Sequence, residues 1–264
     1  MTAKIADLIE FNLLRMALWG LIPFCASEVR PALWMRSSKR AKNQLAPVWK
    51  LRGDLREDVS GIPMPDFGSG RRKTTLDTGT FAKPPTRIVS EIFQKASARH
   101  AWGMLLYHLI KEKQPKTVLE LGTNLGVSGA YIVQAMQENR DRHKRLITLE
   151  GNPSLSERAE KHLAALCGEV DVKVITGMFM DTLPTVLSKW GPFDMVFLDG
   201  HHERNATLRY FDLISPHLES GAWVVFDDLE PWSPTVRGAF RDIRSRYPKA
   251  KTADLVKLGV LIWP

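Results

Sequence analysis

Acidic and histidine side chains gather at two places in this 264-residue sequence. One is the run F-L-D-G-H-H, which contains Asp199, His201 and His202, and the other is V-F-D-D, which ends in Asp227 and Asp228. Each run begins with the apolar residues of a short buried strand. In an open sheet of parallel strands, both runs would end at the same edge, where ligands bind. We therefore expect these side chains to share one reaction site.

The carboxylates and the imidazole at this site indicate acid–base chemistry. Three neighbouring carboxylates raise the pKa of at least one of them unless a cation neutralises the group. A neutral histidine, with an ordinary pKa near ~6.5, can take a proton from a hydroxyl group at working pH. His202 is the candidate base, although it could instead cap the following helix or bond a nearby aspartate. His201 is expected to be structural or to contact the substrate.

A second segment that could bind a ligand is E-L-G-T-N-L-G-V-S, from Glu120 to Ser128. Gly122 follows an apolar strand and lets the backbone turn sharply beneath a ligand, where a Cβ atom would clash. The helix that begins at Gly126 presents unpaired N–H groups that suit a carboxylate. Asn124 interrupts what would otherwise be G-x-G-x-x-G, which argues against a dinucleotide site.

Glu150 ends the next apolar run, 30 residues after Glu120. An acid at the end of the second strand of a nucleotide-binding α/β fold accepts hydrogen bonds from ribose hydroxyls. The other interpretation is that its charge only stabilises the N-terminus of the following helix, by ~0.3–1 kcal/mol. The position at a strand's carboxyl end favours the ribose.

The elements that position these residues alternate regularly. Strands are expected over residues 117–121, 145–150, 170–176, 193–198 and 221–226. Helices are expected over residues 126–138, 153–166, 181–189, 203–218 and 233–246. This alternation predicts an α/β fold with a parallel sheet covered on both faces. Two short strands at 253–257 and 259–263 follow so closely that they must form an antiparallel hairpin.

Five parallel strands and a terminal hairpin resemble the Rossmann-like, seven-stranded sheet of the class I S-adenosylmethionine-dependent methyltransferases, over residues 87–264. The E-L-G-x-x-x-G-x-S motif is similar to that of the catechol O-methyltransferase-like group. The D-G-x-H pattern at Asp199–His202 resembles a broader bacterial methyltransferase group.

The resemblance implies that S-adenosylmethionine is the cofactor. Its methionine part would lie along Gly122, Asn124 and Gly126, with Ser128 at the carboxylate and Glu120 toward the amino group. The adenosine would be held by residues from the ends of three further strands, namely Glu150, Gly177, Met178, Phe179 and Asp199.

The resemblance also implies a Mg²⁺ ion that binds the acceptor hydroxyl, held by Asp199, Asp227 and Asp228. Oxygen ligands with waters suit octahedral Mg²⁺. The related enzymes have asparagine where this chain has Asp228, so the metal requirement stays open. They also have a basic lysine where this chain has His202, which is consistent with a role for His202 as base; Asp199 is the second candidate catalytic residue.

The function expected from the resemblance is methyl transfer to a small-molecule acceptor, most simply at a hydroxyl. No N/D-P-P-Y/F tetrapeptide follows the strand at 193–198, which argues against an amino group on DNA or glutamine. Residues 101–264 carry 20 Lys/Arg and 20 Asp/Glu, and this balance argues against a nucleic-acid partner. The alternative is a protein of the same fold that binds the cofactor without methyl transfer and acts as a scaffold.

Residues 1–86 form a basic extension before this domain, since residues 1–100 carry 17 Lys/Arg against 9 Asp/Glu. A helix is expected over 1–35, but its uninterrupted apolar run of 11 residues is too short to span a membrane, which needs about 20. The helix could pack on the main domain, join a homodimer, or contact a membrane surface through residues 1–40, where Trp19 and Trp34 lie near basic residues.

The rest of the extension, residues 36–86, is expected to be irregular and to precede a helix over 87–113. The irregular segment is either a connecting loop or a lid whose Arg71, Arg72 and Lys73 attract an acidic acceptor. Two cysteines cannot build a disulfide framework, so a cytoplasmic, reducing location is the default.

Overall fold

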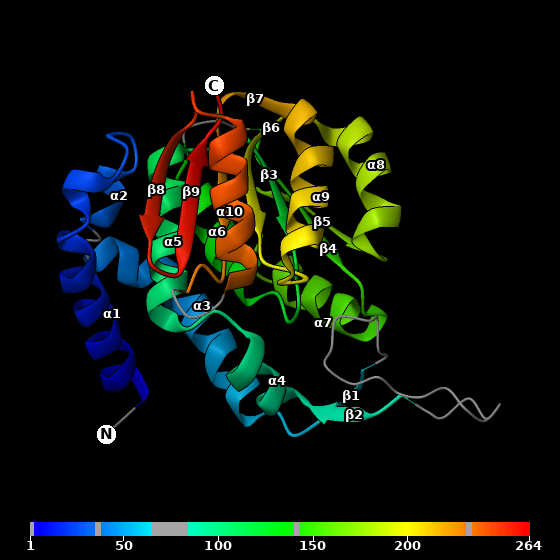
Figure 1. Cartoon of the computed structure of the whole chain (residues 1–264). Coiled ribbons are helices and arrows are strands. Elements are labelled where there is room, and N and C mark those ends of the chain that lie inside the picture. Colours follow the sequence, from blue (N-terminus) through cyan, green and yellow to red (C-terminus); the bar gives the residue numbers. More distant parts are fainter. Residues whose placement is uncertain (1–2, 35–37, 65–83, 140–142, 231–233) are drawn as a thin grey trace.

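A seven-stranded sheet forms the centre of the computed structural model, which describes residues 3–34, 38–64, 84–139, 143–230 and 234–264. The strand order is β5-β4-β3-β6-β7-β9-β8 (Figure 1). The strands are β3 (Thr117–Leu121), β4 (Arg145–Glu150), β5 (Asp171–Thr176), β6 (Phe193–Leu198), β7 (Leu218–Phe226), β8 (Lys251–Leu255) and β9 (Leu258–Ile262). The order reverses between β3 and β6, which is the switch point where open α/β sheets bind ligands.

The pairing confirms the predicted α/β fold. Strands β3 to β7 are parallel, whereas β9 runs antiparallel to β7 and β8 antiparallel to β9. The hairpin strands begin one or two residues earlier than predicted, so only Val256 and Lys257 lie between them. This shift places Lys257 at the tip of the hairpin, next to the end of β7.

Helices cover both faces of the sheet (Figure 1). On one face lie α5 (His100–Lys113), α6 (Val127–Gln137) and α7 (Pro153–Ala164). On the other lie α8 (Phe179–Trp190), α9 (Arg204–Ile214) and α10 (Pro234–Arg246). Successive residues of a strand point to opposite faces, and so Val118 joins the first hydrophobic cluster while Leu119 joins the second. All six residues of β6 are buried, as a strand covered on both sides requires.

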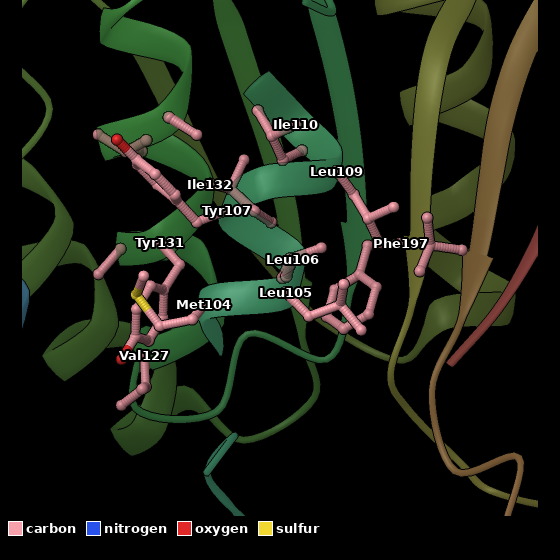
Figure 2. Packing of buried hydrophobic residues seen from close by; sticks show 14 of the residues in the cluster. Met104, Leu105, Leu106, Tyr107, Leu109, Ile110, Val127, Tyr131, Ile132 and Phe197 are labelled. Carbon is pink, nitrogen blue, oxygen red and sulfur yellow. The ribbon is translucent and has the colours of Figure 1, made fainter. Parts of the chain in front are cut away.

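Helix α5 is the buried layer of the first face. Figure 2 shows its Leu105 and Leu109 turned toward Phe197 of β6, and Met104 beside Tyr131 of α6. Gly103 of α5 is needed for this packing, because a Cβ atom there would lie 2.3 Å from the Tyr131 ring. Helix α5 thus packs against both the central strand β6 and helix α6.

The N-terminal region differs from the prediction in two ways. The expected single helix over 1–35 is divided into α1 (Ala3–Trp19), a 3₁₀ turn at Ile22–Phe24 and the short α2 (Arg30–Leu33). Part of the segment predicted as irregular is the 19-residue helix α3 (Lys39–Glu57). Its buried face joins the same hydrophobic cluster as β3 and α5, through Ala41, Leu45, Val48, Leu51 and Leu55. This helix therefore shares the core of the main domain.

The segment before β3 also departs from the prediction. A small antiparallel pair, β1 (Gly61–Pro63) and β2 (Thr86–Ile88), precedes α4 (Val89–Ala96). The single helix expected over 87–113 is interrupted at Ser97, whose extended backbone (ψ 146°) separates α4 from α5. The proposed lid residues Arg71, Arg72 and Lys73 lie outside the described residues. In the described part of the chain, no helix has the length and apolar character that crossing a bilayer requires.

Candidate active site

A cavity of about 940 Å³ lies at the carboxyl ends of β3, β4, β6 and β7. It brings together most of the residues that the sequence singles out. Those in its wall are Gly122, Asn124, Ser128, Glu150, Met178, Phe179, Asp199, His201, His202, Asp227 and Asp228. Three predicted cofactor residues lie outside this wall: Glu120, Gly126 and Gly177.

The turn between β3 and α6 depends on glycine. Gly122 has a φ of +103°, and a Cβ atom there would lie only 2.1 Å from the carbonyl oxygen of Asp199. Asn124 has a φ of +49°, a conformation that asparagine tolerates better than most residues. Gly126 (φ +79°) precedes the first turn of α6, so it shapes the turn without lining the cavity. The backbone itself thus forms this part of the wall.

Glu150 is held across the cavity from Gly122 by backbone donors. One carboxylate oxygen accepts a hydrogen bond from the Asn124 N–H at 2.7 Å, and the other accepts from the Asn152 N–H at 2.8 Å. Burial raises the pKa of Glu150, and these N–H groups oppose that shift. Each oxygen of an ionised carboxylate has two lone-pair sites, so acceptor capacity remains for a pair of ligand hydroxyls. This geometry fits a ribose.

Glu120 lies beneath the turn, not in the cavity wall. It is fully buried and accepts a hydrogen bond from the Thr148 hydroxyl at 2.6 Å. Burial raises its pKa to about 7, opposed by hydrogen bonds from Ser128 and Thr148. Within the described residues, its Oε1 and the Asn124 Oδ1 are buried acceptors without a hydrogen-bond partner. Buried acceptors normally have a donor, and of these two only Asn124 lines the cavity, where an amino acid ammonium would supply one.

The buried Glu120 makes stability depend on pH. Its pKa rises from the usual 4.5 to about 7, so the folded state keeps a proton between these values that the unfolded chain loses. Stability should therefore fall as the pH rises from about 4.5 to about 7, by roughly 3 kcal/mol from this group. Urea unfolding at pH 4.5 and pH 8 measures the effect. Glu120→Gln should show a smaller loss of stability over this interval than the wild type; an equal loss would contradict the assignment.

An apolar surface follows β5. Met178 is 39% exposed and forms part of the cavity wall. Phe179 packs edge-on against Tyr210 (ring centroids 5.5 Å apart) and lies beside Gly200, where a Cβ atom would be 2.6 Å from its ring. Gly177 (φ +144°) turns the chain toward α8 just before these two residues. The result is a flat, apolar surface of the kind that a purine ring can cover.

The acidic end of the cavity contains a lysine that the sequence analysis missed. The ammonium nitrogen of Lys257 lies 3.2 Å from Asp227 Oδ1, 2.5 Å from Asp228 Oδ1 and 3.3 Å from Glu230 Oε1. These carboxylates raise the pKa of Lys257, against the effect of burial. Antiparallel pairing of Phe226 with Gly259 carries the ends of the two strands toward each other, and this register could have indicated the contact.

Asp199 and Asp227 are neighbouring carboxyl groups beside this lysine. Burial raises the pKa of Asp199 well above its usual value, and the negative charge of Asp227 raises it further. Burial also raises the pKa of Asp227, while Lys257 opposes that rise. The raised pKa of Asp199 therefore has two causes, its burial and the neighbouring charge of Asp227.

His202 points its Nδ1 atom at Asp228 Oδ2, at 3.1 Å. The cap of α9 is Glu203, without a side-chain hydrogen bond, so the alternative of His202 as a helix cap is wrong. The side chain of His202 is 46% exposed in the cavity wall, where an acceptor could reach its other ring nitrogen. His201 instead bonds the Tyr210 hydroxyl at 2.8 Å, which favours its structural interpretation.

The predicted Mg²⁺ ligands do not fit a metal ion in this arrangement. No three acidic, histidine or cysteine side chains within the described residues are grouped so that they could hold one. Asp227 and Asp228 face the ammonium of Lys257, and burial together with the charge of Asp227 raises the pKa of Asp199. The ammonium of Lys257 thus already neutralises carboxylates that Mg²⁺ would neutralise.

The break between α4 and α5 adds further residues to the wall. Lys95, Arg99 and Trp102 all line the cavity. The sequence pattern predicts one continuous helix over this segment, and a continuous helix gives no indication that these residues reach the site. Two cations and an indole ring in the same cavity are suited to a flat acceptor with a negative charge.

Comparison with known proteins agrees with this geometry. A family model described as a methyltransferase domain matches residues 119–229, which include every predicted site residue. A catechol O-methyltransferase of Niastella koreensis is 32% identical over 151 residues, which are 53% of this chain and 65% of that protein. A catechol O-methyltransferase of Mycobacterium tuberculosis is 32% identical over 127 residues, 48% of this chain and 54% of that protein.

A solved structure shares the fold. The O-methyltransferase from Bacillus cereus in complex with SAH has a TM-score of 0.52 and 19% identity, covering 64% of this chain and 83% of that chain. This chain matches only part of the two catechol O-methyltransferases, namely 65% and 54% of their own lengths. The match to the family model, residues 119–229, extends from β3 to the end of β7 and so includes the strand ends at which the cavity lies.

Proposed function

We propose that this chain, which carries a class I S-adenosylmethionine-dependent methyltransferase domain, transfers a methyl group to a hydroxyl of a small molecule. The proposal rests on one observation: a single cavity contains both a candidate cofactor-binding arrangement and a candidate general base. Glu150 faces the Gly122 turn at one end, and His202 is paired with Asp228 at the other. The first suits the cofactor and the second suits an acceptor that must lose a proton.

The end of the cavity near Glu150 and Gly122 binds and orients the cofactor. When bound, S-adenosylmethionine supplies an activated methyl group on a positively charged sulfur. Glu150 accepts hydrogen bonds from the ribose hydroxyls, while Met178 and Phe179 pack against the adenine. Asn124 and Ser128 hold the amino acid part, and Glu120 acts from below by positioning Ser128. Fixing two reactants in line can contribute ~7–11 kcal/mol to lowering the barrier.

The acceptor end moves a proton. His202 takes the hydroxyl proton of the acceptor, and Asp228 fixes the orientation of the imidazole through its Nδ1 atom. Such a base contributes roughly 10²–10⁴-fold to the rate. The proposed reaction needs no Mg²⁺, because Lys257 neutralises the carboxylates that were the predicted metal ligands.

The acceptor that fits best is a flat, hydroxylated molecule with a negative charge. Trp102 offers a ring surface, and Lys95 and Arg99 offer cations in the same wall. The catechol O-methyltransferases of Niastella koreensis and Mycobacterium tuberculosis give the first acceptors to try, which are catechols with and without a carboxylate. Nucleic acid is not part of the proposal, since the basic excess lies in residues 1–100.

The test is calorimetry followed by a transfer assay. S-adenosylmethionine should bind with one site per chain, and labelled methyl should then appear in a catechol carboxylate more readily than in the neutral catechol. Binding without transfer to any hydroxylated acceptor would support the alternative of a cofactor-binding scaffold. Absence of binding would contradict both.

For the N-terminal extension, residues 1–86, we propose a contact with an anionic membrane surface at the cytoplasmic side. Leu13 and Met16 of α1 are 61% and 70% exposed, and Trp19 and Trp34 stack edge-on at 5.2 Å with about half of each side chain exposed. Arg15 lies 5.9 Å from the Trp19 ring. Interfacial helices combine apolar, tryptophan and basic side chains in this way.

Vesicle sedimentation tests the membrane contact. The wild type should sediment with vesicles that contain anionic lipid, and Leu13→Glu with Met16→Glu should abolish this. Val59→Glu is the matched control, because Val59 is 82% exposed outside α1 and should not matter. Equal sedimentation of all three would contradict the proposal, as would a wild type that stays in the supernatant and forms a dimer through α1 in sedimentation velocity.

A further inference from the structure

The hairpin between β8 and β9 reaches into the active-site cavity, although it lies outside the segment matched by the methyltransferase family model, residues 119–229. Its tip consists of Val256 and Lys257, and both line the cavity. Val256 has a φ of +74°, which is strained for a β-branched residue and persists only where the surroundings impose it. Because backbone strain is common at functional sites, the strain at Val256 suggests that the position of the adjacent Lys257 is important for function.

Two sets of contacts impose this conformation. The Arg237 guanidinium donates to the carbonyl of Val256 at 3.0 Å and to that of Leu229 at 2.7 Å. It also pairs with Asp254 at 2.5 Å. In addition, the Leu229 N–H donates to the Lys257 carbonyl at 2.8 Å. The tip is therefore tied to α10 and to the loop after β7, and the backbone of Lys257 is fixed.

The side chain of Lys257 is enclosed as well as tied. It is 19% exposed, and its ammonium lies within 3.3 Å of three carboxylates. Two of its three N–H groups donate hydrogen bonds, to Asp228 and Glu230. The contact with Asp227 is an ion pair at 3.2 Å. Lys257 also lines the cavity, where an acceptor oxygen could compete with Asp227 for its third N–H group.

We infer that Lys257 is the built-in cation of the acceptor site, placed where a divalent metal ion would otherwise neutralise the carboxylates, and that it binds the acceptor oxygen. This inference rests on the proposed methyl transfer. Lys257 has two effects: it keeps Asp228 in place for His202, and it offers a positive N–H donor to the oxygen that loses its proton. Without the ammonium, the charges of Asp227, Asp228 and Glu230 would be uncompensated, and an added divalent cation would compensate them although their oxygens are not arranged as a preformed metal site.

The first experiment measures metal binding without using activity. Wild-type protein and Lys257→Met are titrated with Mg²⁺ and Mn²⁺ in calorimetry and in thermal unfolding. The wild type should neither bind the ions nor change its Tm. Lys257→Met, which keeps the length of the side chain and removes its charge, should have a lower Tm and recover part of it when the metal is added. Lys251→Met is the matched control on the same hairpin, since Lys251 is 62% exposed and pairs with Glu28.

The second experiment uses turnover. Wild-type transfer should be unchanged by EDTA, and Lys257→Met should lower kcat by about 10²-fold, as loss of one preorganised donor does. Lys257→Arg should restore part of this loss, and Lys251→Met should have none of it. Stoichiometric Mg²⁺ binding by the wild type, or loss of transfer in EDTA, would overturn the inference and the statement that the reaction needs no Mg²⁺, while methyl transfer to a hydroxyl would still stand. No transfer with any acceptor, together with no metal binding, would overturn the proposed function alone.

Discussion

Replacing Glu150 with glutamine should weaken S-adenosylmethionine binding by about 10²-fold or more, since each hydrogen bond to a charged group contributes ~1.5–3 kcal/mol. Both carboxylate oxygens already accept backbone N–H groups, from Asn124 and Asn152. A glutamine amide would present a donor to one of these N–H groups and would offer the ribose one acceptor oxygen instead of two. The dissociation constants of S-adenosylmethionine and S-adenosylhomocysteine, measured by calorimetry, test this expectation.

A matched control comes from the helix that follows. Glu157 of α7 is exposed and pairs with Lys161 on the surface, so Glu157→Gln should bind the cofactor like the wild type. Circular dichroism and Tm establish that both variants are folded. A folded Glu150→Gln protein with an unchanged dissociation constant would show that the carboxylate does not contact the ribose.

Replacing His202 with alanine should lower kcat by roughly 10²–10⁴-fold and leave cofactor affinity unchanged, because a general base acts in the transition state. His202 lies in the wall of the cavity, and its Nδ1 atom is paired with Asp228. Asp228→Asn should lower kcat in the same direction by a smaller factor, since the imidazole would remain but lose its charged partner. Steady-state kinetics with saturating S-adenosylmethionine measure both effects.

The control for this prediction is another histidine. His217 lies in the 3₁₀ turn before β7, away from the cavity wall, and His217→Ala should keep full activity. A fully active His202→Ala protein would eliminate His202 as the base. A variant that loses cofactor affinity as much as kcat would assign it to binding instead.

The sequence was sufficient for the sheet because its strands are continuous apolar runs. β4 and β6 begin and end at the predicted residues, since 145–150 and 193–198 are bounded by polar or turn-forming neighbours. The predicted cavity residues follow from the same feature: parallel strands end at one edge, so Asp199, Asp227 and Glu150 meet there whatever the helices do.

The sequence was insufficient where position depends on tertiary contacts. Helix α3 is mostly polar and basic and contains a proline at position 47. These features made its helical pattern of buried residues, from Ala41 to Leu55, hard to recognise in the sequence. Glu120 has the right spacing for the cofactor, yet its side chain points beneath the turn because it faces Thr148 of the neighbouring strand. Lys257 could be placed only once the hairpin register was known.

The most direct test of the account is a crystal structure of the protein with S-adenosylhomocysteine. The account predicts that the ribose hydroxyls lie within hydrogen-bond distance of Glu150, with the amino acid part over Gly122 and the sulfur facing His202. A ligand bound elsewhere, or a cavity filled by side chains with Gly122 and Glu150 turned apart, would contradict it.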